Sequence, residues 1–162
     1  MQTPDTNRST DQTDFTVRPL RVEDAQALSS MLLAQSPEYT RYFNAFSFAA
    51  DHIAKMLAER GQDIYMGLLW QDELAGMFML RGWNEGYDVP ALGTFIAEKY
   101  RGYGLMHLTV ETMKVIGRLR GASRVIYKSH PDNAPAKKAA AMGFKLAGVD
   151  PTTGYLLYHF DL

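Results

Sequence analysis

The stretch that decides the fold spans residues 95–105 and reads Phe95-Ile96-Ala97-Glu98-Lys99-Tyr100-Arg101-Gly102-Tyr103-Gly104-Leu105. An apolar strand leads into a short basic loop, and the loop opens an amphipathic helix that we expect from Leu105 to Arg120. The first turn of a helix has backbone N–H groups without partners and carries the positive end of the helix dipole. Gly102 and Gly104 let the main chain approach an anion, and Arg101 adds a positive charge. The pattern predicts a phosphate or pyrophosphate site; the alternative is a tight turn beside a solvated arginine.

Two common phosphate-binding motifs are absent from this stretch. A nucleotide-hydrolase P-loop would read G-x-x-x-x-G-K-[ST], which the sequence lacks. A dinucleotide fingerprint, G-x-G-x-x-G, would need a glycine at position 107, which is His107. The predicted anion site therefore belongs to another class.

Outward from this loop, the order of elements predicts a mixed α/β sheet that carries helices on its faces. Apolar patterns predict strands at 15–20, 64–70, 74–83, 91–97, 123–127, 144–149 and 154–162, and helices from 23, over 51–60 and over 132–142. The aromatic-rich segment 36–48 has no clean period. We expect one domain over 15–162, preceded by a flexible polar tail at 1–14.

Composition excludes several classes of function. Seventeen basic side chains against eighteen acidic ones give a net charge of −1, which predicts neither a nucleic-acid nor a membrane-surface partner. The absence of cysteine excludes a thiolate nucleophile. The histidines show no ligand spacing, so we expect no metal. With neither an apolar run of about 20 residues nor a signal-peptide pattern, we expect a soluble cytoplasmic protein.

Three segments together resemble one family. The loop Arg101-Gly102-Tyr103-Gly104 resembles the coenzyme A loop of the GNAT N-acyltransferase superfamily, whose pattern is [Q/R]-x-x-G-x-[G/A]. Residues 15–28 resemble that family's first strand and helix. Residues 133–136, followed by Met142-Gly143-Phe144, resemble its second cofactor segment, where an asparagine begins a helix that ends in Gly-Phe. The matches occur in the family's order.

The resemblance implies a mostly antiparallel sheet of about seven strands flanked by about four helices, and an acetyl-CoA-dependent acetyltransferase. It implies that the pyrophosphate of acetyl-CoA lies on Arg101, Gly102, Tyr103, Gly104, Leu105 and Met106. Phe95 and Ile96 would pair their backbone with the pantetheine arm, and Asn133 would touch the cofactor near its amide chain. Many family members pair as dimers, so we expect a homodimer.

The sequence departs from the family at two places. The last loop position, usually glycine or alanine, is Met106. The tyrosine that protonates the departing thiolate in much of the family is replaced by Ala139-Ala140-Ala141. The thiol of coenzyme A has a pKa of roughly 8.5, like that of a free cysteine, so turnover does not strictly require this acid.

Two residues are candidates for proton transfer. A substrate amine is mostly protonated at pH 7, so a base should remove a proton directly or through water. Asp88, before the fourth strand, is the first candidate base, with Glu85 as a weaker one; a plain turn residue is the alternative. His130, at the end of the next strand, is a candidate acid or base, or simply a strand-end residue.

The acceptor is the least determined part of the prediction. The segment 81–88 mixes aromatic and polar side chains, and we expect Trp83, Glu85 and Tyr87 to contact an amine on a small polar molecule, such as an amino sugar or a nucleotide-linked sugar. The alternatives are a hairpin pinned by Trp83, a peptide or lysine amine as acceptor, a coenzyme A-binding domain with impaired catalysis, and an interaction module that uses the aromatic segment 39–48.

Overall fold

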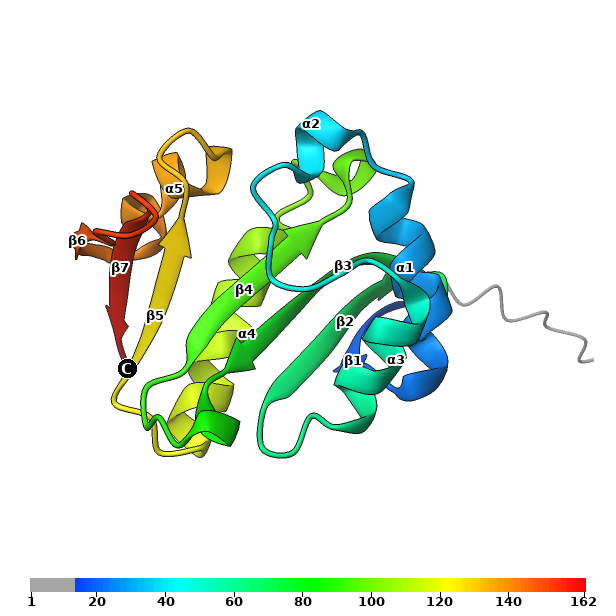
Figure 1. Ribbon diagram of the computed structural model, residues 1–162, viewed down its shortest axis with the longest axis horizontal. Coiled ribbons are helices and arrows are strands. Elements are labelled where there is room, and N and C mark those ends of the chain that lie inside the picture. Colours follow the sequence, from blue (N-terminus) through cyan, green and yellow to red (C-terminus); the bar gives the residue numbers. More distant parts are fainter. Residues whose placement is uncertain (1–13) are drawn as a thin grey trace, which may run out of the picture.

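A seven-stranded sheet in the order β1-β2-β3-β4-β5-β7-β6 forms the centre of the computed structural model, which describes residues 14–162 (Figure 1). The strands are β1 (Phe15–Pro19), β2 (Ile64–Trp70), β3 (Glu73–Arg81), β4 (Ala91–Ile96), β5 (Arg124–Ser129), β6 (Lys145–Val149) and β7 (Leu156–Asp161). The helices are α1 (Ala25–Leu33), α2 (Pro37–Thr40), α3 (Ala50–Ala58), α4 (Leu105–Leu119) and α5 (Ala134–Lys138). The tail predicted at 1–14 lies outside the described residues apart from Asp14.

The sheet is covered on both faces, and each face has its own core. Helices α1 and α3 lie on one face and α4 on the other (Figure 1). On the first face, fully buried Leu28 and Ile53 pack with Met77 of β3. On the second, Met113 of α4 packs among residues of β4, β5 and β7. The apolar side chains at helical spacing in α4 and at alternate positions in the strands account for this sandwich.

Among the described strands, only β4 and β5 pair in parallel, and the sheet splits between these two. Strands β4 and β5 pair only at Ala91–Ile126 and Leu92–Tyr127, whereas the other neighbours run antiparallel. Beyond Leu92 the end of β4 stays on β3, since Ala97 N–H donates to Ala75 O at 2.9 Å. The second half of β4 therefore has an edge that none of the described strands covers.

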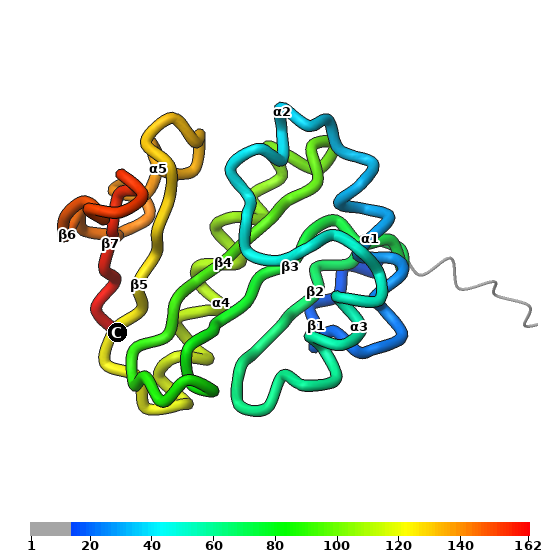
Figure 2. Tube along the Cα trace, viewed as in Figure 1, coloured from blue at the N-terminus to red at the C-terminus, as the bar shows by residue number. Residues whose placement is uncertain are grey.

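An irregular segment, residues 41–48, joins α2 to α3 and arches over β3 and β4; we name it the aromatic strap (Figure 2). Phe43 packs on Phe95 of β4, with ring centroids 5.1 Å apart. Ser29 of α1 donates its hydroxyl to Phe48 O at 2.6 Å. Ring contacts and side-chain hydrogen bonds hold the strap in place, rather than a helix or a sheet ladder. Its apolar residues therefore follow neither the helical nor the strand period.

The predicted fold class is confirmed, with two differences in the helices. Five α-helices flank the sheet instead of about four, because Ser36 caps the short α2 by accepting from Tyr39 N–H at 3.2 Å. The helix predicted at 132–142 breaks into α5 and a 3-10 turn at Ala140–Met142. The hydroxyl of Tyr158 donates to Ala136 O at 3.1 Å, so a tertiary contact takes up a carbonyl of the last turn.

Candidate active site

A cleft of about 860 Å³ opens between the end of β4, the first turn of α4 and the start of α5. The predicted residues that line it are Phe95, Ile96, Arg101, Gly102, Gly104, Leu105, Met106 and Asn133. Tyr103 is in the same loop, with 77% of its surface exposed. The structure therefore brings the two predicted cofactor segments, far apart in the sequence, to the walls of one cavity.

The loop before α4 has room for an anion against its main chain. Gly102 and Gly104 have φ angles of 81° and 84°, a region that L side chains rarely adopt. A Cβ atom built on either glycine meets no protein atom within 4 Å, so open space lies in front of both. The first hydrogen bond of α4 runs from Leu108 N–H to Gly104 O at 3.1 Å, which leaves the N–H groups of 105–107 without helical partners. This arrangement suits a pyrophosphate.

Arg101 adds a charge that the protein itself does not neutralise. Within the described part of the chain, no carboxylate oxygen lies within 4.0 Å of its guanidinium nitrogens. Its guanidinium carbon lies 5.6 Å from the ring centroid of Tyr39. The preceding turn is tied to β3, because Glu73 accepts hydrogen bonds from Lys99 and from the Tyr100 hydroxyl, and these bonds lower the pKa of Glu73. The loop is thus held at its start and free at its glycines.

The uncovered edge of β4 presents alternate backbone groups to the cleft. Phe95 pairs with Met77, and Ala97 N–H bonds to Ala75, so the main-chain groups of these two residues point toward β3. Those of Thr94 and Ile96 point the other way. Both residues predicted to pair with pantetheine line the cleft, but only Ile96 has main-chain groups that point away from β3; the ring of Phe95 packs against Tyr39 and Phe43.

Tyr39 is a cleft residue that sequence reasoning missed. Its hydroxyl donates to Ile96 O at 2.6 Å, and burial raises its pKa, so the hydroxyl stays a neutral donor. Its ring meets the edge of Phe95 at 5.6 Å. Tyr39 comes from a segment without a clean period, and only its place next to the helix cap Ser36 could have predicted a fixed position.

Asn133 begins α5 with its side chain turned back toward β5. Its Nδ2 donates to Ser129 Oγ at 3.2 Å, and Ser129 is buried. Ala141 lines the cleft while Ala139 is fully buried, so this segment presents no hydroxyl acid where the family's tyrosine is expected. The contact with Ser129 fixes Asn133 at the cleft wall.

His130, which follows β5, lies against Tyr42 of the aromatic strap and is not among the residues that line the cleft. Its ring stacks on Tyr42, with centroids 4.3 Å apart and planes 14° apart, and Tyr155 meets its edge at 5.6 Å. The backbone N–H of Asp132 donates to His130 Nδ1 at 3.1 Å. In the neutral ring this bond places the proton on Nε2, which makes Nε2 a hydrogen-bond donor. His130 therefore presents an N–H group rather than a free basic nitrogen.

The turn between β3 and β4 is not brought to the cleft. Trp83, Glu85, Tyr87 and Asp88 precede β4, whereas the cleft lies at the strand's other end (Figure 1). Buried Asp63, before β2, accepts from Gly82 N–H at 3.0 Å and from the N–H of Asn84 at 3.3 Å, which pins this turn to the α3–β2 loop. The indole of Trp83 faces Arg120 at 4.3 Å. The expected contact of Trp83, Glu85 and Tyr87 with the cleft is thus not found.

The comparisons define the class of the protein. Residues 14–145 match the acetyltransferase (GNAT) domain family. The solved RimL ribosomal L7/L12 alpha-N-protein acetyltransferase superposes with a TM-score of 0.78 at 17% identity, over 93% of this chain and 91% of that one. PaiA N-acetyltransferase from Thermoplasma acidophilum, in complex with coenzyme A, gives 0.77 at 12% identity, over 92% and 99%. The ribosomal-protein-S5-alanine acetyltransferase from Vibrio fischeri gives 0.76 at 16%, over 91% and 92%.

A mixed α/β domain with a glycine-containing loop beside a split sheet is the architecture that these acetyltransferases share. The chain belongs to the GNAT acetyltransferase family. No curated protein matches its sequence. Among the described helices, none combines the length and the apolar character needed to cross a membrane.

Proposed function

We propose that this enzyme transfers the acetyl group of acetyl-CoA to the primary amine of a small polar molecule, such as an amino sugar or a nucleotide-linked sugar. One observation carries the proposal: a single cleft joins the free N–H groups of α4, the unpaired charge of Arg101 and the uncovered edge of β4. These are the groups needed to hold a pyrophosphate and an amide-containing arm in line. In this arrangement Arg101 to Met106 bind the pyrophosphate, Ile96 pairs with pantetheine, and Asn133 contacts the arm.

The chemistry is a direct attack. The amine nitrogen attacks the thioester carbonyl carbon, a C–N bond forms and the C–S bond breaks. The nitrogen loses one proton and the departing thiolate gains one, which gives the N-acetyl amine and free coenzyme A. Asp88, the base predicted from the sequence, precedes β4 and does not line the cleft, so in this arrangement the proton passes to water and the role of Asp88 stays a prediction. His130 Nε2–H donates toward the thioester or the leaving sulfur.

The strap supports a small acceptor over a protein. Tyr42 stacks on His130, and Asn44 Nδ2 donates to the Tyr155 hydroxyl at 3.4 Å, so side chains from the strap reach across to β5 and the β6–β7 loop. These contacts narrow the approach to the cleft. RimL and the S5-alanine enzyme act on ribosomal proteins, and a peptide amine remains the alternative acceptor. A third possibility, impaired catalysis, rests on Ala139-Ala140-Ala141. The homodimer and the cytoplasmic location stay predictions.

The test is thiol release from acetyl-CoA with a panel of amines: amino sugars, small diamines and short peptides with free N-termini. We expect the highest kcat/KM with a small amine. Asp88→Asn tests the predicted base: loss of a general base lowers kcat by about 10²-fold or more, whereas a kcat equal to that of the exposed control Asp51→Asn assigns proton removal to water. Faster turnover of the peptides would favour the protein acceptor. Binding of acetyl-CoA without turnover of any amine would favour the impaired domain.

A further inference from the structure

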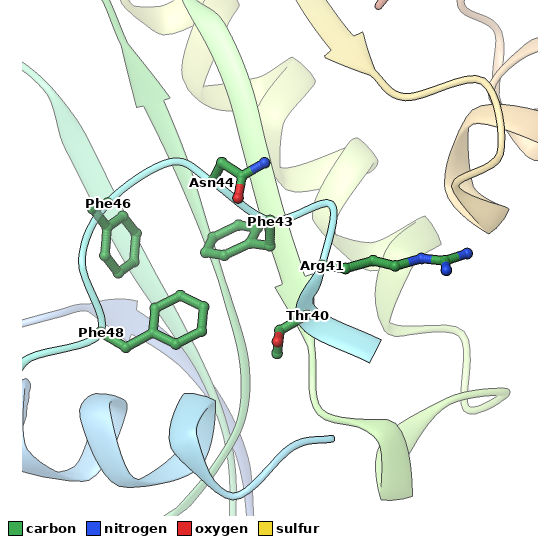
Figure 3. A pocket seen from close by; sticks show the side chains of 6 residues that line it. All are labelled: Thr40, Arg41, Phe43, Asn44, Phe46 and Phe48. Atoms are coloured by element: carbon green, nitrogen blue, oxygen red, sulfur yellow. The ribbon is translucent and has the colours of Figure 1, made fainter. Parts of the chain in front are cut away.

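Arg41, at the start of the aromatic strap, is a second cation that has no carboxylate partner among the described residues. It lines the cleft and also an outer hollow of about 460 Å³, whose other walls are Thr40, Phe43, Asn44, Phe46 and Phe48. Its side chain extends away from the three phenylalanine rings (Figure 3). Within residues 14–162, no carboxylate oxygen lies within 4.0 Å of its guanidinium nitrogens. A permanent charge thus stands where the two cavities meet.

Arg41 is the outer layer of a stack of three side chains. Its guanidinium carbon lies 4.5 Å from the ring centroid of Tyr42, and Tyr42 stacks on His130 at 4.3 Å. The bond from Asp132 N–H to His130 Nδ1 makes Nε2–H a donor. The carboxylate of Asp132 lies 3.8 Å from Nδ1 and so does not occupy the Nε2 proton. Tyr42 therefore lies between His130 and Arg41, and the guanidinium of Arg41 forms the outer, cleft-lining side of the stack.

We infer that Arg41 binds an anionic group of the acceptor, so that the substrate is a primary amine that also carries a carboxylate or a phosphate. A guanidinium forms two parallel charge-assisted hydrogen bonds to either group. The inference rests on the proposed acetyltransferase function and narrows its substrate class.

The position of Arg41 assigns it to the acceptor rather than to the phosphates of coenzyme A. Arg101 and Asn133 line the cleft but not the outer hollow, whereas Arg41 lines both. Glu38, three residues before Arg41, lines the cleft too and supplies a negative charge for an ammonium group. An acceptor that carries both charges matches this pattern.

The first test uses amine pairs that differ in one anion: phosphoethanolamine and ethanolamine, β-alanine and propylamine, glucosamine 6-phosphate and glucosamine. Thiol release is followed at saturating acetyl-CoA. For at least one pair we expect the anionic member to have a kcat/KM at least about tenfold higher, as a charged hydrogen bond allows. In Arg41→Ala this advantage should fall to near unity while the neutral member changes less than twofold. The control Arg118→Ala, exposed on α4 and absent from the cleft lining, should keep it.

The second test separates the two sources of anion. With coenzyme A saturating its own phosphate sites, millimolar inorganic phosphate should raise the melting temperature of the wild type and of Arg118→Ala but not of Arg41→Ala. The Kd for coenzyme A should be the same in all three proteins. A weaker Kd for coenzyme A in Arg41→Ala, with the pair preference intact, would assign Arg41 to the donor and overturn the inference.

The remaining outcomes also decide. Equal turnover of both members of every pair would overturn the inference and leave the acetyltransferase standing. If the wild type does not bind acetyl-CoA, both the proposed function and the inference are overturned. If acetyl-CoA binds but no member of any pair is acetylated, the melting temperature with phosphate decides. A rise in the wild type that is absent in Arg41→Ala supports the anion site. No rise in the wild type overturns the inference.

Discussion

Tyr39 occupies a hydrogen-bonding position on the edge of β4 that the described strands leave uncovered. Its hydroxyl donates to Ile96 O, the carbonyl that faces the cleft. The proposed path of the pantetheine arm runs along the same edge, so an amide N–H of the arm and the Tyr39 hydroxyl compete for one acceptor. Binding of the donor then includes the loss of a bond within the protein.

Tyr39→Phe should therefore bind acetyl-CoA more tightly. Removing the competing hydroxyl spares the donor the net value of one hydrogen bond, about 0.5–1.5 kcal/mol, which corresponds to a two- to tenfold lower Kd. Titration calorimetry gives the Kd directly. Tyr87→Phe, at a side chain that is 63% exposed and outside the cleft lining, is the control and should leave the Kd unchanged. Equal or weaker binding by Tyr39→Phe would show that the hydroxyl and the arm do not compete.

At the scale of the elements, the loop before α4 contains glycines with positive φ angles and also lines the cleft. Gly104 precedes the helix at φ 84°, and Gly121 follows it at φ 75°; a methyl carbon added to either glycine would meet no protein atom within 4 Å. Both glycines carry the same conformational requirement, but only Gly104 lines the cleft. They form a natural pair for separating stability from binding.

Gly104→Ala and Gly121→Ala should each lower the free energy of unfolding by about 1–2 kcal/mol, because an L side chain is strained at positive φ. Urea unfolding measures this loss. Only Gly104→Ala should also weaken acetyl-CoA binding, because its methyl group projects into the space proposed for the pyrophosphate. If both variants bound acetyl-CoA as the wild type does, the loop would not be the phosphate site.

The β6–β7 loop has a pH-sensitive anchor in Asp150. Its carboxylate accepts from Lys128 Nζ at 3.0 Å, from Thr152 N–H at 2.9 Å and from Thr153 N–H at 3.2 Å, and these bonds lower its pKa to about 2. The folded pKa lies below the unfolded value of about 3.9. The carboxylate therefore stabilises the fold above that value, and the stabilisation is lost as the pH falls toward 2.

Asp150→Asn should lower the melting temperature at pH 7, and the difference from the wild type should shrink as the pH falls from about 4 to about 2. Thermal unfolding across this range measures the difference. The loop also carries Tyr155, which meets His130, so the variant should loosen that contact. No difference at pH 7 would mean that the amide replaces the carboxylate fully, and a difference that stays constant from about pH 4 to about pH 2 would mean that the charge of Asp150 does not stabilise the loop.

Elements were predictable where the sequence repeats a local pattern. The long helix α4 and the strand β2 match their predicted spans closely, because core side chains recur at helical or alternating positions. The break after α5 was not predictable, because no local pattern marks it; a hydroxyl from a distant strand, that of Tyr158, bonds to the Ala136 carbonyl there. The strap was not predictable either, since its conformation is set by contacts such as that of Phe43 with Phe95.

At the scale of the whole molecule, two halves of the sheet meet at a short joint. Strands β4 and β5 share only two paired positions, and the core behind them includes Met113 of α4, which is fully buried. Met113 thus holds β1–β4 and β5–β7 together beneath the cleft.

Met113→Ala should lower the free energy of unfolding by about 2–5 kcal/mol, the cost of a cavity in a core of this kind. Urea unfolding with an unchanged m value is the readout. Met113→Leu, which nearly conserves volume, should cost less than about 1.5 kcal/mol. A small effect of the alanine variant would place the joint elsewhere than in this core.

Some residues of the candidate site were predictable from the local sequence, and others are placed only by tertiary contacts. The loop at 101–106 was predictable because strand, glycines and helix are contiguous in the sequence. The turn at 83–88 adjoins β4, and its place in the sequence therefore suggests that it lies near the cleft. It adjoins the first residue of β4, however, whereas the cleft lies at the last. The point at which β4 and β5 part is a tertiary feature that no local pattern indicates. Tyr39 and Arg41 reach the cleft only through the tertiary path of the strap.

The central claim is that acetyl-CoA binds in the cleft on the loop that contains Arg101, and thermal unfolding with and without acetyl-CoA tests it most directly. At 100 times its Kd a ligand adds about 2.7 kcal/mol, which should raise the midpoint by roughly 5–10 °C in a domain of this size. The account predicts this rise in the wild type and in Arg118→Ala, and its loss in Arg101→Ala. No rise in the wild type at millimolar acetyl-CoA, or an equal rise in Arg101→Ala, would contradict it.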